Sequence, residues 1–213
     1  MHREMTVKWL GHSCFKIECR GASLVIDPYN HVQGYPALKT HANIVLTSHG
    51  HGDHAYIDAV EIEGYEGPLP FDIKAVECFH DDCGGAKRGK NLIHVIKAGG
   101  MTAVHMGDLG HKLSSEQIRA IGPCDLVMIP VGGYYTIDAE TAKEVCDSLD
   151  PRVIIPMHYR RGSLGFDVIG ELSSFLKLFP GDFVRETGGD TFILDDDTPS
   201  QVAVLTFMEN GNK

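Results

Sequence analysis

The stretch Ser48-His49-Gly50-His51-Gly52-Asp53-His54 gathers three histidines and one aspartate within residues 49–54. It follows the run 43–47, whose apolar centre is typical of a short buried strand. Imidazole nitrogens and carboxylate oxygens at this density are characteristic of a transition-metal site. The sequence therefore predicts a metal centre in the loop that follows this strand.

Length and composition indicate a globular chain without large anionic partners. The 213 residues, 43% of them hydrophobic, predict a single domain over 1–213 with a sizeable core. The formal net charge of −10 disfavours nucleic acid or an anionic membrane surface as a general partner. No stretch approaches the roughly 18 apolar residues of a membrane span, and the first residues lack a long apolar segment. We therefore expect a cytoplasmic protein.

The spacing of apolar residues predicts two strand-rich halves, each followed by helical segments. In the first half we expect strands over 6–10, 14–18, 22–26 and 44–46, and a helix that begins within 55–60. In the second half we expect strands over 92–96, 101–106, 126–130 and 152–156, with edge strands over 191–194 and 201–207. The expected helices cover 114–121, which Ser114 would cap, together with 139–149 and 168–178.

Polar side chains follow four of the predicted strands. The histidine-rich loop follows one strand, His80 follows 75–79, Asp108 follows 104–107, and His158 follows 153–156. Strand ends hold side chains more rigidly than loop tips do, which a metal site requires. We therefore expect these four strand ends to converge on one site.

At these residues the chain resembles the metallo-β-lactamase-fold hydrolases. The family's His-x-His-x-Asp-His signature is present as His49, His51, Asp53 and His54. The other family motifs resemble Ile26-Asp27-Pro28, His80-Asp81, Gly107-Asp108 and Pro156-Met157-His158, in the family's order. Segments 9–13, 87–91 and 129–133 narrow the resemblance to small bacterial hydrolases that include the ascorbate-6-phosphate lactonase-like proteins. The resemblance implies an α/β (α+β) fold, a four-layer αββα sandwich with a metal centre at one edge of its two sheets.

Carried over residue by residue, the family pattern implies two divalent metal ions, with zinc expected and manganese, iron or nickel as alternatives. His49, His51 and His80 would bind the first ion. Asp53, His54 and His158 would bind the second ion, and Asp108 would bridge both. A metal lowers the pKa of bound water to about 7, so that a bridging hydroxide would be the nucleophile. The implied reaction is hydrolysis of an ester, lactone, amide or phosphodiester.

Residues near the expected centre have functional and structural interpretations. His12 is either a proton donor or substrate contact, which would place it with Asp53 and Asp108 in catalysis, or an ordinary core or surface histidine. Asp27 either supports the metal loop or begins a turn. In the glycine-rich basic loop 84–90, Arg88 and Lys87 either clamp an anionic substrate group or belong to a solvated turn in which Arg88 pairs with an acidic neighbour. Tyr134 and Tyr135 either line the pocket or pack.

Three classes of function follow from this pattern. A metal-dependent hydrolase acting on a small-molecule substrate is favoured, because both metal positions have complete ligand sets. The alternatives are a metal-binding protein with little turnover and a metal-centred oxidoreductase or sulfur dioxygenase of the same fold. The sequence does not distinguish a monomer from a homo-oligomer, and it does not name the substrate.

Overall fold

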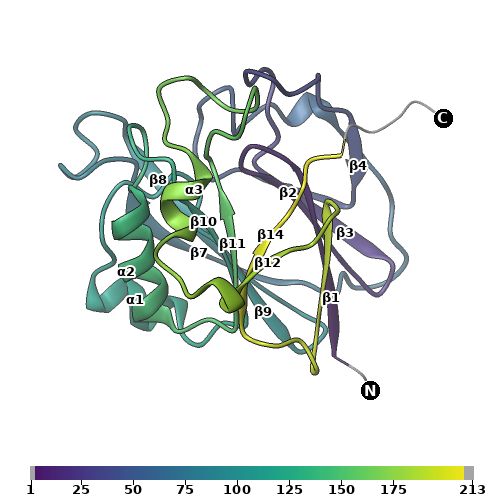
Figure 1. Ribbon diagram of the computed structural model, residues 1–213. Coiled ribbons are helices and arrows are strands. Elements are labelled where there is room, and N and C mark those ends of the chain that lie inside the picture. The colour runs from purple at the N-terminus through teal and green to yellow at the C-terminus, as the bar shows by residue number, and fades with distance from the viewer. Residues whose placement is uncertain (1–2, 209–213) are drawn as a thin grey trace.

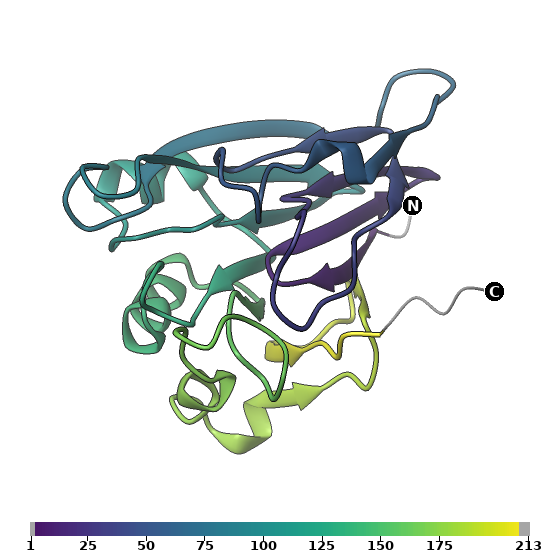
Figure 2. The same ribbon diagram turned by 90° about the horizontal axis from the view of Figure 1, so that it is seen from above.

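The structure, a computed structural model, describes residues 3–208, which form two large β-sheets and three α-helices (Figures 1 and 2). The five-stranded sheet has the strand order β13-β1-β2-β3-β5. Its strands are β1 (Glu4–Gly11), β2 (Cys14–Cys19), β3 (Ala22–Ile26), β5 (Ile44–Leu46) and β13 (Thr191–Asp195). The meander predicted for the first three strands is confirmed, since β1 to β3 pair antiparallel in sequence order.

The seven-stranded sheet has the order β12-β14-β11-β10-β9-β8-β7. Its strands are β7 (Asp72–Phe79), β8 (Lys90–Ala98), β9 (Met101–His105), β10 (Leu126–Pro130), β11 (Val153–Met157), β12 (Val184–Glu186) and β14 (Gln201–Val204). Strands β10 and β11 are buried along their whole length, as parallel strands covered on both faces are. The two large sheets contribute to one continuous hydrophobic core, in which Phe15 of β2 contacts His105 of β9.

The helices lie on the side of the seven-stranded sheet away from β1 to β3 (Figure 1). They are α1 (Ser115–Ile121), α2 (Ala139–Leu149) and α3 (Leu172–Leu176). The predicted cap of α1 is confirmed, because Ser114 and Gln117 form a reciprocal capping box. Helices outside two packed sheets agree with the predicted α/β sandwich. None of the helices in residues 3–208 is long and apolar enough to cross a membrane.

The expected helix within 55–60 is wrong. The segment forms one 3-10 turn, η1 (Ile57–Ala59), and then β6 (Val60–Ile62), which pairs with β4 (Thr40–Ala42) in a small separate sheet. The Tyr56 N–H donates to the Pro28 carbonyl, which ties the start of the segment to the loop after β3. Tertiary hydrogen bonding thus replaces the local helical pattern.

Two C-terminal predictions also need correction. The helix expected over 168–178 is limited to α3, because Gly170 N–H donates to the Gly132 carbonyl and thereby fixes the preceding backbone against another loop. The strand expected over 201–207 ends at Val204 and is not at an edge, since it lies between β12 and β11. The sequence pattern missed β12, which follows the short turn η2 (Gly181–Phe183).

The directions of the strands explain why the polar residues that follow them meet at one edge of the sandwich. Strands β1, β3 and β5 point the same way, because β1 and β3 are both antiparallel to β2 and β5 is parallel to β3. Strands β7, β9 and β11 likewise share one direction in the other sheet. The residues that follow these six strands are His12, Asp27, the loop 48–54, His80, Asp108 and His158.

Candidate metal centre

Potential metal ligands form three groups at this edge of the sandwich: two share no residue, and the third, made of His49, His54 and Asp108, links them. The first cluster consists of His49, His51 and His80, and the second cluster consists of His12, Asp53, His54 and His158. Within each cluster, one potential ligand atom per residue lies within 4.8 Å of the others. The four strand ends predicted to converge therefore do so, and His12 from a fifth strand joins them.

Asp108 lies between the two clusters. Its Oδ2 is 3.2 Å from His80 Nε2 and 3.3 Å from His158 Nε2. Its Oδ1 is 3.2 Å from His54 Nε2, and its Oδ2 is 3.9 Å from His49 Nε2. Asp108 thus faces histidines of both clusters, which is the position that a bridging ligand would occupy.

The chemistry of these side chains fits metal binding. Among the described residues, the buried atoms without a hydrogen-bond partner include His49 Nε2, His54 Nε2, His158 Nε2 and Asp108 Oδ1. A buried polar atom left unpaired costs about 1–3 kcal/mol, so four of them in one place need another partner. Cations bound at the two clusters would satisfy all of them, and mixed imidazole and carboxylate donors suit zinc and neighbouring transition metals.

The electrostatics of the site favour ionised carboxylates and neutral His12 and His49, whereas for His54 the effect of burial is outweighed by Asp108 and Asp27, which raise its pKa well above the ordinary value. Burial, reinforced by His158, lowers the pKa of His12 to about 4. Burial, reinforced by His54, likewise lowers the pKa of His49 to about 4. Burial alone would raise the pKa of Asp108, but His158 and His54 hold it well below its ordinary value. Neutral imidazole and ionised carboxylate are the forms that bind a metal ion.

Asp27 is buried and forms hydrogen bonds with both ends of the histidine-rich loop. Its carboxylate accepts hydrogen bonds from the Ser48 N–H at 2.6 Å and the Ser48 hydroxyl at 2.6 Å. It also lies 2.8 Å from His54 Nδ1. Burial would raise the pKa of Asp27, but His54 holds it below its ordinary value, so the group is a carboxylate. In the neutral form of His54, an acceptor at Nδ1 places the proton there and leaves the Nε2 lone pair facing Asp108, where it would bind a metal ion.

The backbone of the site is strained at three positions. His12, Asp27 and His158 have φ values of 51°, 52° and 52°, in the left-handed region that side chains other than glycine seldom adopt. Each such residue costs on the order of 1–3 kcal/mol, and this strain is characteristic of functional sites. All three follow the end of a strand, where the left-handed turn redirects the chain.

The turn before Asp108 depends on Asn91 and Gly107, which the sequence analysis places in family motifs without assigning either a role of its own. Asn91 accepts a hydrogen bond from the Asp108 N–H at 2.9 Å and donates to the Met106 carbonyl at 2.9 Å. Gly107 has a φ of 54°, and a Cβ at this position would collide with the side chains of Asn91 and Ser48. An asparagine within an apolar strand carries no functional signal by itself, so only the packed structure identifies Asn91.

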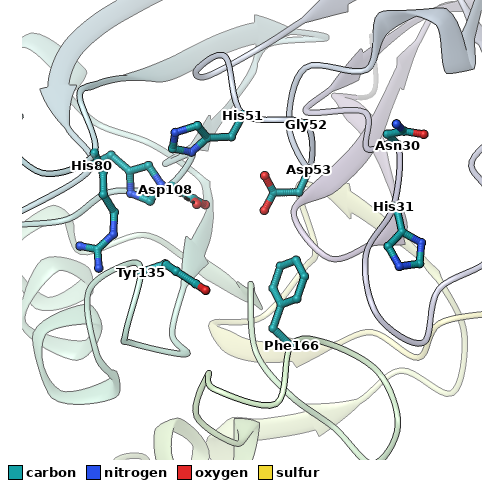
Figure 3. Close-up of a pocket in the computed structure, with 10 residues that line it drawn as sticks. Asn30, His31, His51, Gly52, Asp53, His80, Asp108, Tyr135 and Phe166 are labelled. Carbon is teal, nitrogen blue, oxygen red and sulfur yellow. Dashed lines mark ion pairs between the residues drawn. The ribbon is translucent and has the colours of Figure 1, made fainter.

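A cavity of about 460 Å³ opens beside the clusters (Figure 3). Its lining includes the potential ligands His51, Asp53, His80 and Asp108. The remaining lining residues are Asn30, His31, Gly52, Arg88, Tyr135 and Phe166. Figure 3 shows the rings of Tyr135 and Phe166 across the cavity from His51. The site therefore combines polar donors with aromatic surface, as small-molecule sites do.

In the glycine-rich basic loop 84–90, Arg88 faces the cavity whereas Lys87 does not. The loop backbone is ordered by Asp81, whose carboxylate accepts four backbone N–H groups at 2.8–2.9 Å, those of residues 83, 85, 87 and 88. Arg88 Nη2 donates to the Tyr134 carbonyl at 2.9 Å, and its guanidinium lies 5.6 Å from the Tyr135 ring centre. Lys87 instead pairs with Asp82 at 3.2 Å and does not line the cavity.

The structure changes expectations for three residues near the cavity, namely Tyr134, Arg88 and His12. Tyr135 lines the cavity beside the clusters, whereas Tyr134 is 64% exposed and contributes its backbone carbonyl to Arg88. The alternative of an Arg88 tied to an acidic neighbour does not match its contacts, which are a carbonyl and a ring. His12 has a fully buried side chain and is not among the residues that line the cavity.

Comparison with known proteins agrees with the fold and the site. A family model described as the beta-lactamase superfamily domain matches residues 6–158. A metal-dependent hydrolase of Pelotomaculum thermopropionicum is 34% identical, covering 73% of this chain and 84% of that protein. A metal-dependent hydrolase of Thermoplasma volcanium is 29% identical, covering 78% and 86% of the two chains.

A solved structure also matches. The crystal structure of a proposed zinc-dependent hydrolase of the metallo-β-lactamase superfamily from Thermotoga maritima is 33% identical, with a TM-score of 0.74. The match covers 94% of this chain and 98% of that one. This chain therefore belongs to the metallo-β-lactamase superfamily of metal-dependent hydrolases, and the fold and family predicted from its motifs are confirmed.

Proposed function

We propose that the protein is a dinuclear hydrolase. The first cluster would hold one divalent ion, Asp53, His54 and His158 would hold a second, and Asp108 would bridge them. The observation that carries this proposal is the position of Asp108, whose two oxygens face histidines of both clusters at 3.2–3.3 Å. Zinc is the expected metal, because the donors are mostly imidazole nitrogens.

The bound ions would supply the nucleophile and activate the bond, since they lower the pKa of a coordinated water to about 7 and polarise an ester, lactone, amide or phosphodiester. The protein itself would contribute negative charge and carboxylates at fixed positions. Asp108 and Asp53 offset the charge of two dications in a buried site. The Asp53 side chain is 23% exposed and lines the cavity, and its Oδ2 is directed at His12 and His54. We propose that its other oxygen accepts a proton during hydrolysis.

The shape of the cavity supports a small substrate with an anionic group. A volume of about 460 Å³ lies within the range of sites for small molecules. Tyr135 and Phe166 offer apolar surface, and the guanidinium of Arg88 retains N–H groups besides the one directed at the Tyr134 carbonyl. We propose that Arg88 binds a carboxylate or phosphate of the substrate, which orients the scissile bond toward Asp108.

Metal analysis combined with a hydrolysis screen tests the dinuclear assignment. Protein purified without added metal should contain close to two ions per chain and should hydrolyse at least one ester, lactone, amide or phosphodiester. His51→Ala and Asp108→Ala should lose metal and activity together while the circular dichroism spectrum is retained. His41→Ala is the control, because His41 is exposed and lies outside both clusters. Unchanged metal content in both site variants, or iron loading with oxygen uptake and no hydrolysis, would contradict the proposal.

The role of Arg88 has a matched control in the neighbouring cation. Arg88→Gln should lower kcat/KM for an anionic substrate by about 10- to 100-fold, because a hydrogen bond to a charged group contributes about 1.5–3 kcal/mol. The same variant should leave hydrolysis of a neutral analogue unchanged. Lys87→Gln removes a positive charge from the adjacent residue, which faces Asp82, and should change neither rate. Equal losses for both substrates in Arg88→Gln would refute the role in binding an anion.

A further inference from the structure

His12 is held in the interior of the site by its backbone. It follows β1 in a left-handed conformation with a φ of 51°, and its carbonyl accepts a hydrogen bond from Trp9 Nε1 at 2.9 Å. The side chain has no solvent exposure. The imidazole is therefore a fixed part of the buried cluster and not a group that swings into the substrate cavity.

The ring of His12 is surrounded by the residues of the second cluster. Its centre lies 4.3 Å from the ring centre of His158 and 5.5 Å from that of His54. Its Nε2 lies 3.6 Å from Asp53 Oδ2. Both ring nitrogens are buried and neither has a hydrogen-bond partner among the described residues. An imidazole in this state needs a partner that the protein itself does not provide.

The spacing around His12 matches metal ligands better than hydrogen-bond partners. A distance of 3.6 Å exceeds the 2.7–3.2 Å range of hydrogen bonds between nitrogen and oxygen. Two ligands at about 2.0–2.1 Å from one tetrahedral ion are separated by about 3.3–3.4 Å. His54 Nε2 and Asp53 Oδ2, which would share the second ion, are 3.7 Å apart, close to the distance seen for His12.

We propose that His12 is a ligand of the second metal ion through Nε2, an assignment that rests on the proposed dinuclear function. The second ion would then have His12, Asp53, His54 and His158 as its own ligands and would share Asp108 with the first. The first ion would have only the three imidazoles of the first cluster and the shared carboxylate. The two positions are therefore unequal, and the second should hold its ion more tightly.

A direct test detects the bond between metal and nitrogen. The wild-type protein, with ¹⁵N-labelled histidine, is loaded with ¹¹³Cd²⁺ as a substitute for zinc, and scalar coupling between cadmium and ring nitrogens is measured. Comparison with His12→Gln assigns the His12 resonances. Coupling to His12 Nε2 supports the proposal. Coupling to His54 and His158 without coupling to His12 overturns it, whereas absence of coupling to any histidine contradicts the proposed metal centre as a whole.

The affinity of the second ion provides an independent test. Glutamine retains a polar side chain of similar size but is a poor ligand, so His12→Gln should weaken binding of the second zinc ion more than about 100-fold. That exceeds the 10- to 100-fold loss typical of a residue that only orients a ligand. His31→Gln, which changes an exposed histidine of the same cavity, should keep both ions. A loss below about 100-fold in His12→Gln would overturn direct ligation.

Discussion

Replacing Asp27 by asparagine tests whether Asp27 supports metal binding by the histidine-rich loop 48–54, because the substitution should weaken metal binding without preventing folding. In the native site the Asp27 carboxylate accepts from the Ser48 N–H and hydroxyl and from His54 Nδ1 at 2.6–2.8 Å. Asparagine has the same shape and tolerates the left-handed backbone at this position, where φ is 52°. The substitution therefore changes hydrogen-bond chemistry and little else.

Asparagine can face His54 in two ways, and both impair metal binding. If its NH₂ group faces His54, it donates to Nδ1 and moves the imidazole proton to Nε2, the atom that lies 3.2 Å from Asp108. If its oxygen faces His54 instead, its NH₂ opposes the Ser48 N–H, and an unpaired buried donor costs about 1–3 kcal/mol. We expect the second ion to bind 10- to 100-fold more weakly, which corresponds to about 1.4–2.8 kcal/mol.

Alanine at the same position is a poorer probe. It would leave three buried donors without an acceptor at about 1–3 kcal/mol each, a sum comparable to the whole stability of a typical domain. Asp27→Asn should instead lower the unfolding free energy of the metal-free protein by only about 2 kcal/mol, because most of its hydrogen bonds are replaced by neutral ones.

Metal affinity is measured by competition with a chromophoric chelator, and stability by urea unfolding in the presence of a strong chelator. Asp138→Asn is the control, because Asp138 caps α2 through the Thr141 N–H and asparagine caps equally well. A second ion that binds to Asp27→Asn within threefold of its wild-type affinity would refute the role assigned to Asp27.

Three further perturbations test other parts of the structure. Gly107→Ala should lower the urea-unfolding free energy by at least about 2 kcal/mol, because its Cβ would meet packed side chains. Gly21→Ala, in the turn between β2 and β3, has a positive φ of 77° but open space, so it should lose only about 1 kcal/mol; equal losses would refute the steric argument. Asp81→Asn should accelerate hydrogen exchange of the loop amides at 83–88, and unchanged protection would contradict its role as their common acceptor. Burial raises the pKa of the Cys124 thiol to about 12, so the folded state keeps the proton that the unfolded chain releases near pH 9. Stability should therefore fall as pH rises from about 9 to 12, by up to about 1.4 kcal/mol per pH unit for this thiol, and less steeply in Cys124→Ala.

The errors of the sequence analysis have a common physical origin. The segments 55–60 and 168–178 have helical spacing of apolar residues, yet most of each is not helical. In both, backbone hydrogen bonds to distant loops, such as Tyr56 to Pro28 and Gly170 to Gly132, fix a different conformation. Local periodicity describes which side chains can be buried together, but it contains no information on partners far away in the chain.

The cavity illustrates the same limit for function. Arg88 is a candidate because it is a cation in a glycine-rich loop, but its separation from Lys87 depends on tertiary contacts: Asp81 holds the loop backbone, Asp82 pairs with Lys87, and the Tyr134 carbonyl accepts from Arg88. Phe166 comes from a segment without any functional pattern and reaches the cavity through the loop after β11. Substrate selectivity is therefore encoded by contacts that no short motif contains.

The sequence by itself determined the family, the α/β sandwich and the candidate ligands, because the histidine-rich loop and its three distant partners have fixed residue types in a fixed order. Only the tertiary structure decided how those side chains are arranged in space. Strands β1, β3 and β5 end at the same edge as β7, β9 and β11, which places Asp108 between the clusters and His12 beside Asp53 and His158. Strand direction across two sheets is set by pairing between distant segments, and a linear pattern does not record it.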